Sequence, residues 1–590
     1  MTGPASSPRA SAWRPPLLAW LLVSVLLLLT SLGGVLAGEF PDPDDALRLV
    51  QVRDLIAGQN WFDFHQYRIN PTEPPVMHWS RLVDVPLLAI IAALAPLVGQ
   101  SAAEHVASVI VPLLALLVTI LAIARVAARL VEREAVILAG LSVGFMPMLV
   151  YQFQPMRIDH HGWQIALTAL ALVAVFGAHK WRGGALAGLA MAAGMMISLE
   201  LLPVAAIFAG MLALRWLRDR DERQGLVGYL QALAVGLVAL FLATRGAGDV
   251  ALWCDAITWP HIAFFAIVAA GATLVSRFRA KPLVAMAGLA VTGGIALAAF
   301  GLLSPECLRT PFGALDPVVR DFWYFNVSEG RPIWEQSGNA LAIAFQILVG
   351  IAVTIWLLRK AGTERTREWI DFAVLLGGLS LLGLFVWRSM AFASVLATIP
   401  IGMVLHLGLK QLRSATNPAI RIGTILGLFV VLAPMALVTG AKGIVPQERA
   451  EASAPQAVQL EASGCELRES AEKLGVLAPT TIFAPLDIGP AILQHSRHAV
   501  IATAHHRAEQ SMRDVILTFV GSPDRARTMV AKHGATYVAL CTDLIEADLY
   551  ATKGGADSFA ARLRKGDAPE WLEPVDVGAP ESFKVWRVKN

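Results

Sequence analysis

Long apolar runs separated by short polar stretches fill the chain from its beginning to about residue 440. Thirteen runs approach the ~20 residues with which a helix crosses a bilayer. They lie near residues 17–36, 105–124, 135–150, 164–178, 185–199, 201–214, 227–243, 261–276, 283–303, 338–358, 370–387, 390–409 and 422–439. The pattern predicts a polytopic α-helical membrane protein. We interpret the first run as an uncleaved helix; a signal peptide is the alternative.

Basic residues occupy alternate polar stretches, as the positive-inside rule requires of loops on the cytoplasmic side. Arg9 and Arg14 precede the first run, and further clusters lie at 125–133, 179–182, 215–223, 277–281, 359–367 and 410–421. We therefore expect a cytoplasmic N-terminus. An odd number of spans then places the part after residue 440 outside, in the periplasm of a Gram-negative cell. The expected location is the bacterial inner membrane.

The predicted outer loops are long and rich in acidic and aromatic residues. They cover 38–104, 152–162, 246–260 and 304–337, and together with the spans they form a first domain, 1–440. An apolar segment at 86–98 is too short to span and predicts an interfacial helix.

Residues 441–590 have the charge density of a soluble protein and predict a periplasmic α/β domain. Candidate strands lie at 480–484, 499–504, 536–540 and 583–588, and candidate helices at 459–474, 508–519, 523–533 and 558–565.

Composition agrees with a membrane protein. The chain is 56% hydrophobic and only 16% charged, with a mean hydropathy of +0.59, which excludes an ordinary globular enzyme. A net charge of +3 gives no reason to expect nucleic acid. All four cysteines fall in predicted outer segments, so we expect disulfides between Cys254 and Cys307 and between Cys465 and Cys541. Four buried free thiols are the alternative.

Two clusters of ionisable residues follow predicted spans on the outer side. Asp42, Asp44 and Asp45 repel one another and need a compensating cation, which is a metal, an arginine or the solvent. Asp159 and His161 are two positions apart, so in an extended loop they share a face. Together the clusters offer a mixed oxygen and nitrogen set suited to Mn²⁺ or Mg²⁺. Interfacial loops with water-facing polar groups are the alternative for either cluster alone.

These motifs, in this order, resemble those of the oligosaccharyltransferase catalytic subunits, especially the single-subunit bacterial and archaeal enzymes. The resemblance covers nearly the whole chain and implies a GT-C fold with thirteen transmembrane helices and a C-terminal periplasmic domain. The matching segments are Asp42-Pro43-Asp44, the stretch 53–58, Asp159-His160-His161, Asn326-Val327-Ser328-Glu329 in the fifth-loop motif, and Arg388 near the eleventh helix.

The sequence departs from the family in the C-terminal domain. The family's Trp-Trp-Asp-Tyr-Gly motif, which clasps the acceptor sequon, has Pro485-Leu486-Asp487-Ile488-Gly489 as its nearest counterpart. Asp487 and Gly489 remain as acceptor-side candidates, but both tryptophans are absent. A standard sequon acceptor is therefore in doubt.

The resemblance implies an inverting, metal-dependent transfer of a sugar or oligosaccharide from a polyprenyl-(pyro)phosphate donor to a glycan, lipid or protein acceptor. A divalent ion held by Asp44, Asp159 and His161 would neutralise the leaving phosphate, with Asp42 as a further ligand or an orienting group. Asp44 or Asp45 would be the general base.

Three further residues have candidate roles. Arg388 would bind the donor phosphate, although a snorkelling interfacial arginine is the alternative. Glu329 would hold the acceptor, although an exposed loop glutamate is usually only solvated. Glu200 is an ionisable group beside apolar runs and thus an acceptor-side candidate. A turn between two helices explains Glu200 equally well.

Two other functions compete with this interpretation. The first is a protein N-oligosaccharyltransferase with atypical sequon recognition. The second is a transporter or flippase of lipid-linked glycans, for which internal repeats and mid-membrane charges are typical; we find neither. The pair His505-His506 suggests a metal site, but no third ligand is evident nearby in the sequence, so we expect a surface turn or an acceptor contact.

Overall fold

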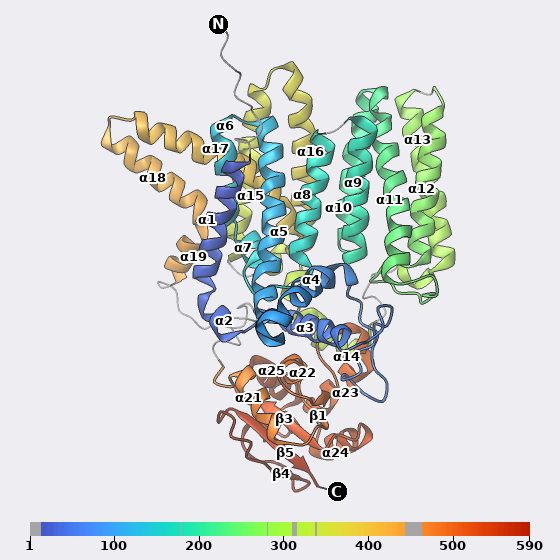
Figure 1. Cartoon of the computed structure of the whole chain (residues 1–590), viewed down its shortest axis with the longest axis vertical. Helices are drawn as coiled ribbons and strands as arrows, with labels where there is room; N and C mark the ends of the chain where they lie inside the picture. Colours follow the sequence, from blue (N-terminus) through green and yellow to red (C-terminus); the bar gives the residue numbers. More distant parts are fainter. Residues whose placement is uncertain are drawn as a thin grey trace.

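The computed structural model describes residues 13–177, 179–279, 281–308, 315–336, 339–442 and 463–589. It has two parts, a layer of long helices and a smaller α/β domain below it (Figure 1). Arg9, part of the predicted fourth outer loop and the first residues of the predicted helix at 459–474 lie outside the described residues. The predicted boundary at residue 440 falls beside the undescribed segment 443–462 and stays a prediction.

Every predicted apolar run coincides with a helix of the upper layer. Nine helices of the described chain are long and apolar enough to span a membrane, a tenth span is a pair bent by 75°, and three helices are shorter. The chain is therefore a multi-pass membrane protein. The helices are α1 (Arg14–Thr30), α5 (Gln100–Leu130), α6 (Arg133–Leu141), α7 (Pro147–Phe153), α8 (His161–Gly177), α9 (Lys180–Ile197), α10 (Leu201–Arg218), α11 (Arg223–Thr244), α12 (Trp259–Arg277), α13 (Pro282–Leu303), α15 (Asn339–Lys360), α16 (Thr363–Phe385), α17 (Met390–Ser414), α18 (Pro418–Leu432) and α19 (Pro434–Lys442).

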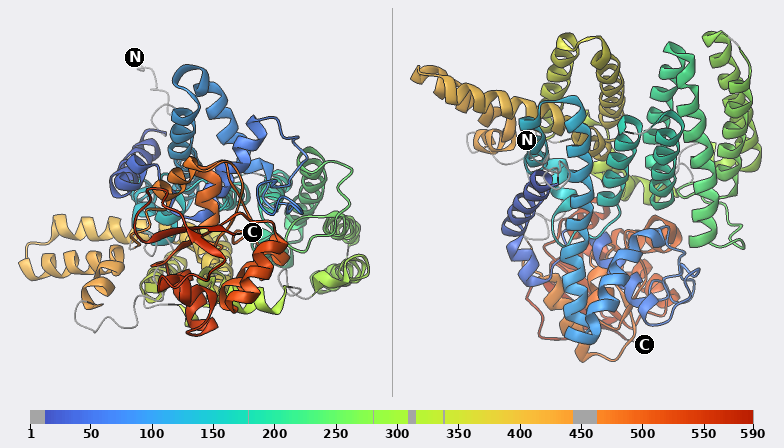
Figure 2. Two further views of the ribbon diagram at one scale, coloured as in Figure 1. Left: turned by 90° about the horizontal axis from the view of Figure 1, so that it is seen from below. Right: turned by 45° about the horizontal axis from the view of Figure 1, so that its top comes forward.

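Small residues bring α9 and α11 together. A Cβ atom on Gly184 would lie 1.9 Å from the carbonyl oxygen of Gly225, and one on Gly188 would lie 2.2 Å from that of Tyr229. Close backbone approach at glycines is how helices gain packing contacts in lipid, where no hydrophobic force drives them together. At the edges of the layer, α12 and α13 lie on one side and α18 projects from the other (Figures 1 and 2).

Three helices lie at the lower end of this layer, one at the end of the first predicted span and two in the first predicted outer loop. They are α2 (Leu32–Ala37), α3 (Pro43–Ile56) and α4 (Arg81–Val98). The predicted interfacial segment at 86–98 is the C-terminal part of α4, which by length and composition is one of the nine candidate spans. In Figure 1, α4 lies beside α3, between the long helices and the lower domain.

The lower domain contains a five-stranded sheet in the order β2-β1-β3-β5-β4. β1 (Thr481–Phe483) pairs in parallel with β2 (Ala499–Val500) and β3 (Tyr537–Cys541), whereas β5 (Phe583–Val588) is antiparallel to β3 and β4. The four predicted strands are therefore found, and β4 (Leu572–Pro574) was missed because two of its three residues are exposed and it carries no apolar run. The helices are α21 (Leu467–Lys473), α22 (Gly489–His495), α23 (Glu509–Val520), α24 (Pro523–Lys532), α25 (Ile545–Gly554) and α26 (Phe559–Arg564). The sequence pattern did not predict α22 and α25.

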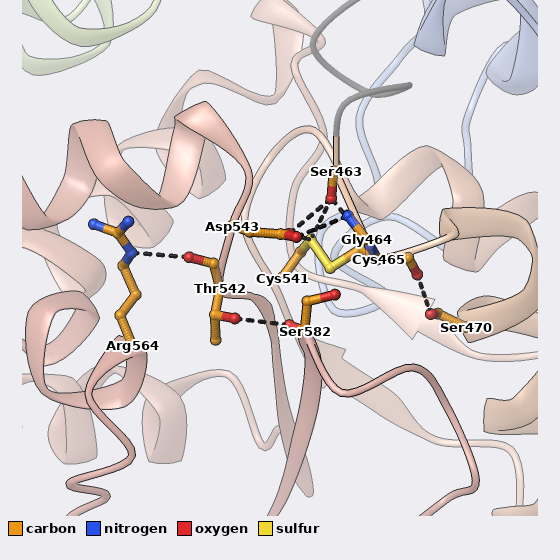
Figure 3. Close-up of a disulfide and its surroundings, with 9 residues drawn as sticks. All are labelled: Ser463, Gly464, Cys465, Ser470, Cys541, Thr542, Asp543, Arg564 and Ser582. Carbon is orange, nitrogen blue, oxygen red and sulfur yellow. Dashed lines mark hydrogen bonds between the residues drawn. A yellow bond between two sulfur atoms is a disulfide. The ribbon is translucent and has the colours of Figure 1, made fainter.

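Both predicted disulfides are present. Cys254 bonds to Cys307, which ties the third outer loop to the fourth, and Cys465 bonds to Cys541 at the end of β3. Figure 3 shows the second one beside Asp543, which accepts hydrogen bonds from the Ser463 hydroxyl and the Gly464 amide. This bridge fastens the beginning of the described lower domain to its sheet.

The first outer loop and the lower domain share one hydrophobic core. Leu47 and Val50 of α3, with Ile69 and Trp79 of the loop, are buried against residues of the sheet and α22. The loop also extends the sheet, because the amide of Val500 donates to the carbonyl of residue 68 and the amide of residue 70 donates back to Val500. The lower domain is thus fixed beside the start of α3, which carries the acidic cluster.

Candidate active site

The acidic cluster forms the N-terminus of α3. Asp42 is the N-cap and accepts the amide of Asp44 at 3.0 Å, and Pro43 occupies the first helical position. Asp and Pro are favoured at these two positions, so the Asp-Pro-Asp sequence itself sets the helix start. Asp44 and Asp45 follow in the first turn, where the helix dipole favours negative charge.

Arg157 is the arginine that partly compensates these acids. Its Nη1 atom lies 2.9 Å from the Asp45 carboxylate and 3.2 Å from Asp42. Asp45 is fully buried and also accepts the amide of Asp159 at 2.7 Å. Arg157 was not among the predicted site residues, although its position two residues before Asp159 was a signal that could have identified it.

Asp159 joins the second cluster to the first. One carboxylate oxygen lies 2.5 Å from His160 Nδ1 and 3.7 Å from Arg48 Nη2, and the other lies 3.4 Å from His161 Nε2. Candidate ligand atoms of Asp159, His160 and His161 all lie within 4.8 Å of one another. His160 was missed because an extended loop would point it away, but the chain turns here as α8 begins at His161.

Two acids of the cluster lie where their negative charge is disfavoured. Burial, together with the charges of Asp42 and Asp159, raises the pKa of Asp44 well above its ordinary value. Burial likewise raises the pKa of Asp45 to about 8, although Arg157 acts in the opposite direction. Like charges held together in this way favour a bound cation.

The donor set fits a divalent metal ion. The Asp159 Oδ2 atom is buried and has no hydrogen-bond partner among the described protein atoms. Carboxylate oxygens beside imidazole nitrogens suit Mn²⁺ or Zn²⁺, and an all-oxygen subset would suit Mg²⁺. Of the predicted ligands, Asp159 and His161 lie in one group of candidate ligand atoms, which His160 completes, whereas Asp42 and Asp44 are not part of that group.

Arg388 approaches the same cluster from the other side. It lies in the turn η7 (Trp387–Ser389) between α16 and α17, where Nη2 is 2.6 Å from Glu200 and Nη1 is 3.3 Å from Glu329. Glu200 in turn lies 3.9 Å from His161 Nδ1. The buried Nε atom of Arg388 has no hydrogen-bond partner in the described structure. An arginine paired with two carboxylates and left with a free donor differs from one that only snorkels to the interface.

The acceptor-side candidates of the lower domain have structural partners. The amides of Leu486 and Asp487 donate to the Glu546 carboxylate at 2.8 and 2.9 Å. A Cβ atom on Gly489 would lie 2.8 Å from the carbonyl oxygen of Ala502, so only glycine fits at the start of α22. Close packing therefore explains Gly489 without any acceptor.

No protein-family model and no curated protein matches the sequence. Solved structures of the archaeal oligosaccharyltransferase AglB from Archaeoglobus fulgidus do match. Its complex with an inhibitory peptide and a dolichol-phosphate has a TM-score of 0.66 at 12% identity, over 96% of this chain and 73% of that one. Its apo form gives 0.65 at 13% identity over the same shares. Its complex with Zn and sulfate gives 0.62 at 11% identity, over 98% and 73%.

The chain has the GT-C fold of an oligosaccharyltransferase. This confirms the fold that the motifs predicted, and at such low identity it shows the fold alone.

On this oligosaccharyltransferase fold, segments far apart in the sequence meet at one place. The start of α3, the turn before α8, the turn before α10, the loop around residue 329 and the turn before α17 are joined by the contacts described above. The predicted residues that come together are Asp42, Asp44, Asp45, Asp159, His161, Glu200, Glu329 and Arg388.

Proposed function

We propose that this protein is a membrane glycosyltransferase that transfers a sugar or oligosaccharide from a polyprenyl-(pyro)phosphate donor to an acceptor on the periplasmic side. One observation carries the proposal. The acidic cluster around Asp159 is connected through His161 and Glu200 to Arg388 on an oligosaccharyltransferase fold. A carboxylate and imidazole site beside a half-buried arginine fork provides separate places for a cation and for a phosphate.

The donor side of the mechanism follows from these contacts. Asp44, Asp159 and His161 would hold a divalent ion with the help of Asp42, and that ion, when bound, stabilises negative charge on the leaving phosphate. Arg388 exchanges Glu200 and Glu329 for phosphate oxygens, since its guanidinium already lies between these two carboxylates. Similarity to AglB, solved in complex with a dolichol-phosphate, supports a lipid-linked donor.

The transfer itself is a single displacement with inversion. The acceptor attacks the anomeric carbon as the bond to the phosphate oxygen breaks, and its proton passes to a carboxylate. Asp44 is better placed for this than Asp45. Asp45 is fully buried and occupied by Arg157 and the Asp159 amide, whereas Asp44 is less completely buried at the first turn of α3. Asp45 therefore positions Asp159.

The acceptor is a glycan, a lipid or a protein other than a standard sequon peptide. AglB has been solved tethered to an acceptor peptide containing an NVT sequon. In this chain, Leu486, at the position of the family's second tryptophan, is 2% exposed and packs in the core of the lower domain. Its side chain is thus not available to clasp a peptide.

The test is donor turnover by the purified full-length protein with a synthetic polyprenyl-linked sugar, with Asp159→Asn and Asp44→Asn as the variants. We expect each to lower turnover by at least about 100-fold, because losing a group that only orients a metal ligand already costs up to that factor. Wild-type turnover should stop in EDTA and return with Mn²⁺ or Mg²⁺. The control is Asp63→Asn, which alters a half-buried carboxylate of the first outer loop bonded to His65 and Tyr67.

Full turnover in both site variants would refute the metal site. Mass spectrometry of the glycans and glycoproteins that disappear on gene deletion identifies the acceptor. Loss of sugar from Asn-x-Ser/Thr peptides would instead support the protein N-oligosaccharyltransferase alternative.

A further inference from the structure

A second group of side chains that could hold a metal ion lies where the lower domain meets two outer loops, and none of its members belongs to the catalytic site described above. His78 comes from the first outer loop, Asp255 from the third, and His506 from the lower domain. One ligand atom from each lies within 4.8 Å of the other two. The sequence near His505 and His506 offers no further ligand. His78 and Asp255, each more than two hundred positions away, supply it in the folded chain.

The contacts inside this cluster hold its side chains in place. His506 Nε2 lies 2.6 Å from Asp255 Oδ2, and His78 Nδ1 lies 2.7 Å from His505 Nε2. Arg507 donates to both oxygens of Asp255, at 2.9 and 2.8 Å, and orients that carboxylate. A metal-binding histidine usually has its other ring nitrogen bonded to a neighbour, as His78 does through His505.

The cluster is not fully satisfied by protein atoms. His505 is 2% exposed, and its Nδ1 atom has no hydrogen-bond partner in the described structure. Imidazole nitrogens gathered in one place are ligands for a transition-metal ion, because the metal binds the unprotonated nitrogen.

We propose that His78, Asp255 and His506 bind a divalent transition-metal ion of the Zn²⁺ type, which fastens the lower domain to the outer loops. Two imidazoles and a carboxylate are a common zinc donor set. In the present arrangement His506 donates through Nε2 to Asp255. Metal binding at this nitrogen requires the tautomer with the proton on Nδ1, and it replaces one hydrogen bond with bonds to the metal. None of the three residues is a ligand proposed for the catalytic ion.

The ion would join three segments that are otherwise far apart in the chain. Asp255 follows Cys254, whose disulfide with Cys307 already ties the third and fourth outer loops together. His506 lies beside Arg507, which also stacks on Trp253 at 4.1 Å. A metal at this point would complete a junction of four segments around the lower domain.

The test is the zinc content of the full-length protein in detergent, after removal of metal with EDTA and dialysis against buffered Zn²⁺. The background carries Asp159→Asn and His161→Ala, so that the catalytic ion is lost. We expect one equivalent of zinc in this background and its loss on adding His78→Ala or His506→Ala. Zinc should also raise the Tm of the background protein and leave the Tm of those variants unchanged.

The matched control is His65→Ala in the same background, since His65 belongs to the first outer loop but pairs only with Asp63 among the ion pairs of the described residues. This control variant should still bind one equivalent of zinc. X-ray absorption at the zinc edge gives a measurement without cluster variants, and we expect nitrogen and oxygen ligands, including imidazole, at about 2.0 Å. No zinc in the background, retention of zinc in both His variants, or an absorption spectrum without imidazole would overturn the proposal.

Discussion

Arg157 links the three carboxylates on which the catalytic proposal depends. It is buried and lies 2.9 Å from Asp45, 3.2 Å from Asp42 and 3.6 Å from Asp159. A buried ion pair contributes little net stability, but removal of one partner leaves an uncompensated charge that is costly. Arg157 therefore holds the acids together whether or not a metal is bound.

We expect Arg157→Met to lower the free energy of unfolding by about 3–5 kcal/mol, the usual cost of breaking a buried pair. Thermal denaturation of the purified protein measures this. Arg320→Met is the control, because Arg320 is an exposed residue paired with Asp321 and should change stability very little. Equal free energies of unfolding of the two variants would mean that Arg157 does not compensate the buried charge of these acids.

Arg388→Lys keeps the charge but removes the guanidinium fork. If Arg388 binds donor phosphate, the KM for the lipid-linked sugar should rise by about 10-fold or more, since a bidentate contact is replaced by a point charge. Steady-state turnover against donor concentration measures this. Arg331→Lys is a matched control, because Arg331 is an arginine of the same outer region that pairs with Glu335. An unchanged KM in Arg388→Lys would contradict the phosphate role.

At the scale of elements, the contact between α9 and α11 depends on glycine. Gly188→Ala would place a Cβ atom 2.2 Å from the Tyr229 carbonyl oxygen. Overpacking of this kind costs about 1–3 kcal/mol, so we expect a lower Tm and less protein in the membrane. Gly210→Ala in α10 meets no atom within 4 Å and should be neutral. If both variants have the same Tm, the packing of α9 against α11 does not depend on glycine at position 188.

The beginning of α3 shows how far local sequence determines an element. The Asp-Pro start, the N-cap bond and the acids of the first turn all follow from known preferences at helix N-termini. The turn before α8 differs, because an extended loop was expected there and the helix begins at His161 instead. The acidic motif was predicted residue by residue, whereas the contribution of His160 was not.

At the scale of the whole molecule, the disulfide between Cys465 and Cys541 closes a loop of 76 residues in the lower domain. The paired substitution Cys465→Ser and Cys541→Ser should destabilise this domain by about 2–5 kcal/mol, the usual effect of removing a native disulfide. Proteolysis of the lower domain under native conditions measures the effect. The pair Cys254→Ser and Cys307→Ser is the comparison, and it should leave the lower domain resistant.

The sequence by itself predicted the membrane class, the helical runs, four of the five strands and both disulfides, and it supplied candidate site residues whose roles stay predictions. The helices and the candidate motifs depend on information close along the chain: the length of apolar runs, the sign of loop charges, and motif spacing. Only the tertiary structure decided which charged groups face one another. Arg157 between the acids, Glu200 between His161 and Arg388, and His78 beside Asp255 and His506 are pairings across long separations. Such pairings follow from how helices and loops pack, and no local pattern encodes them.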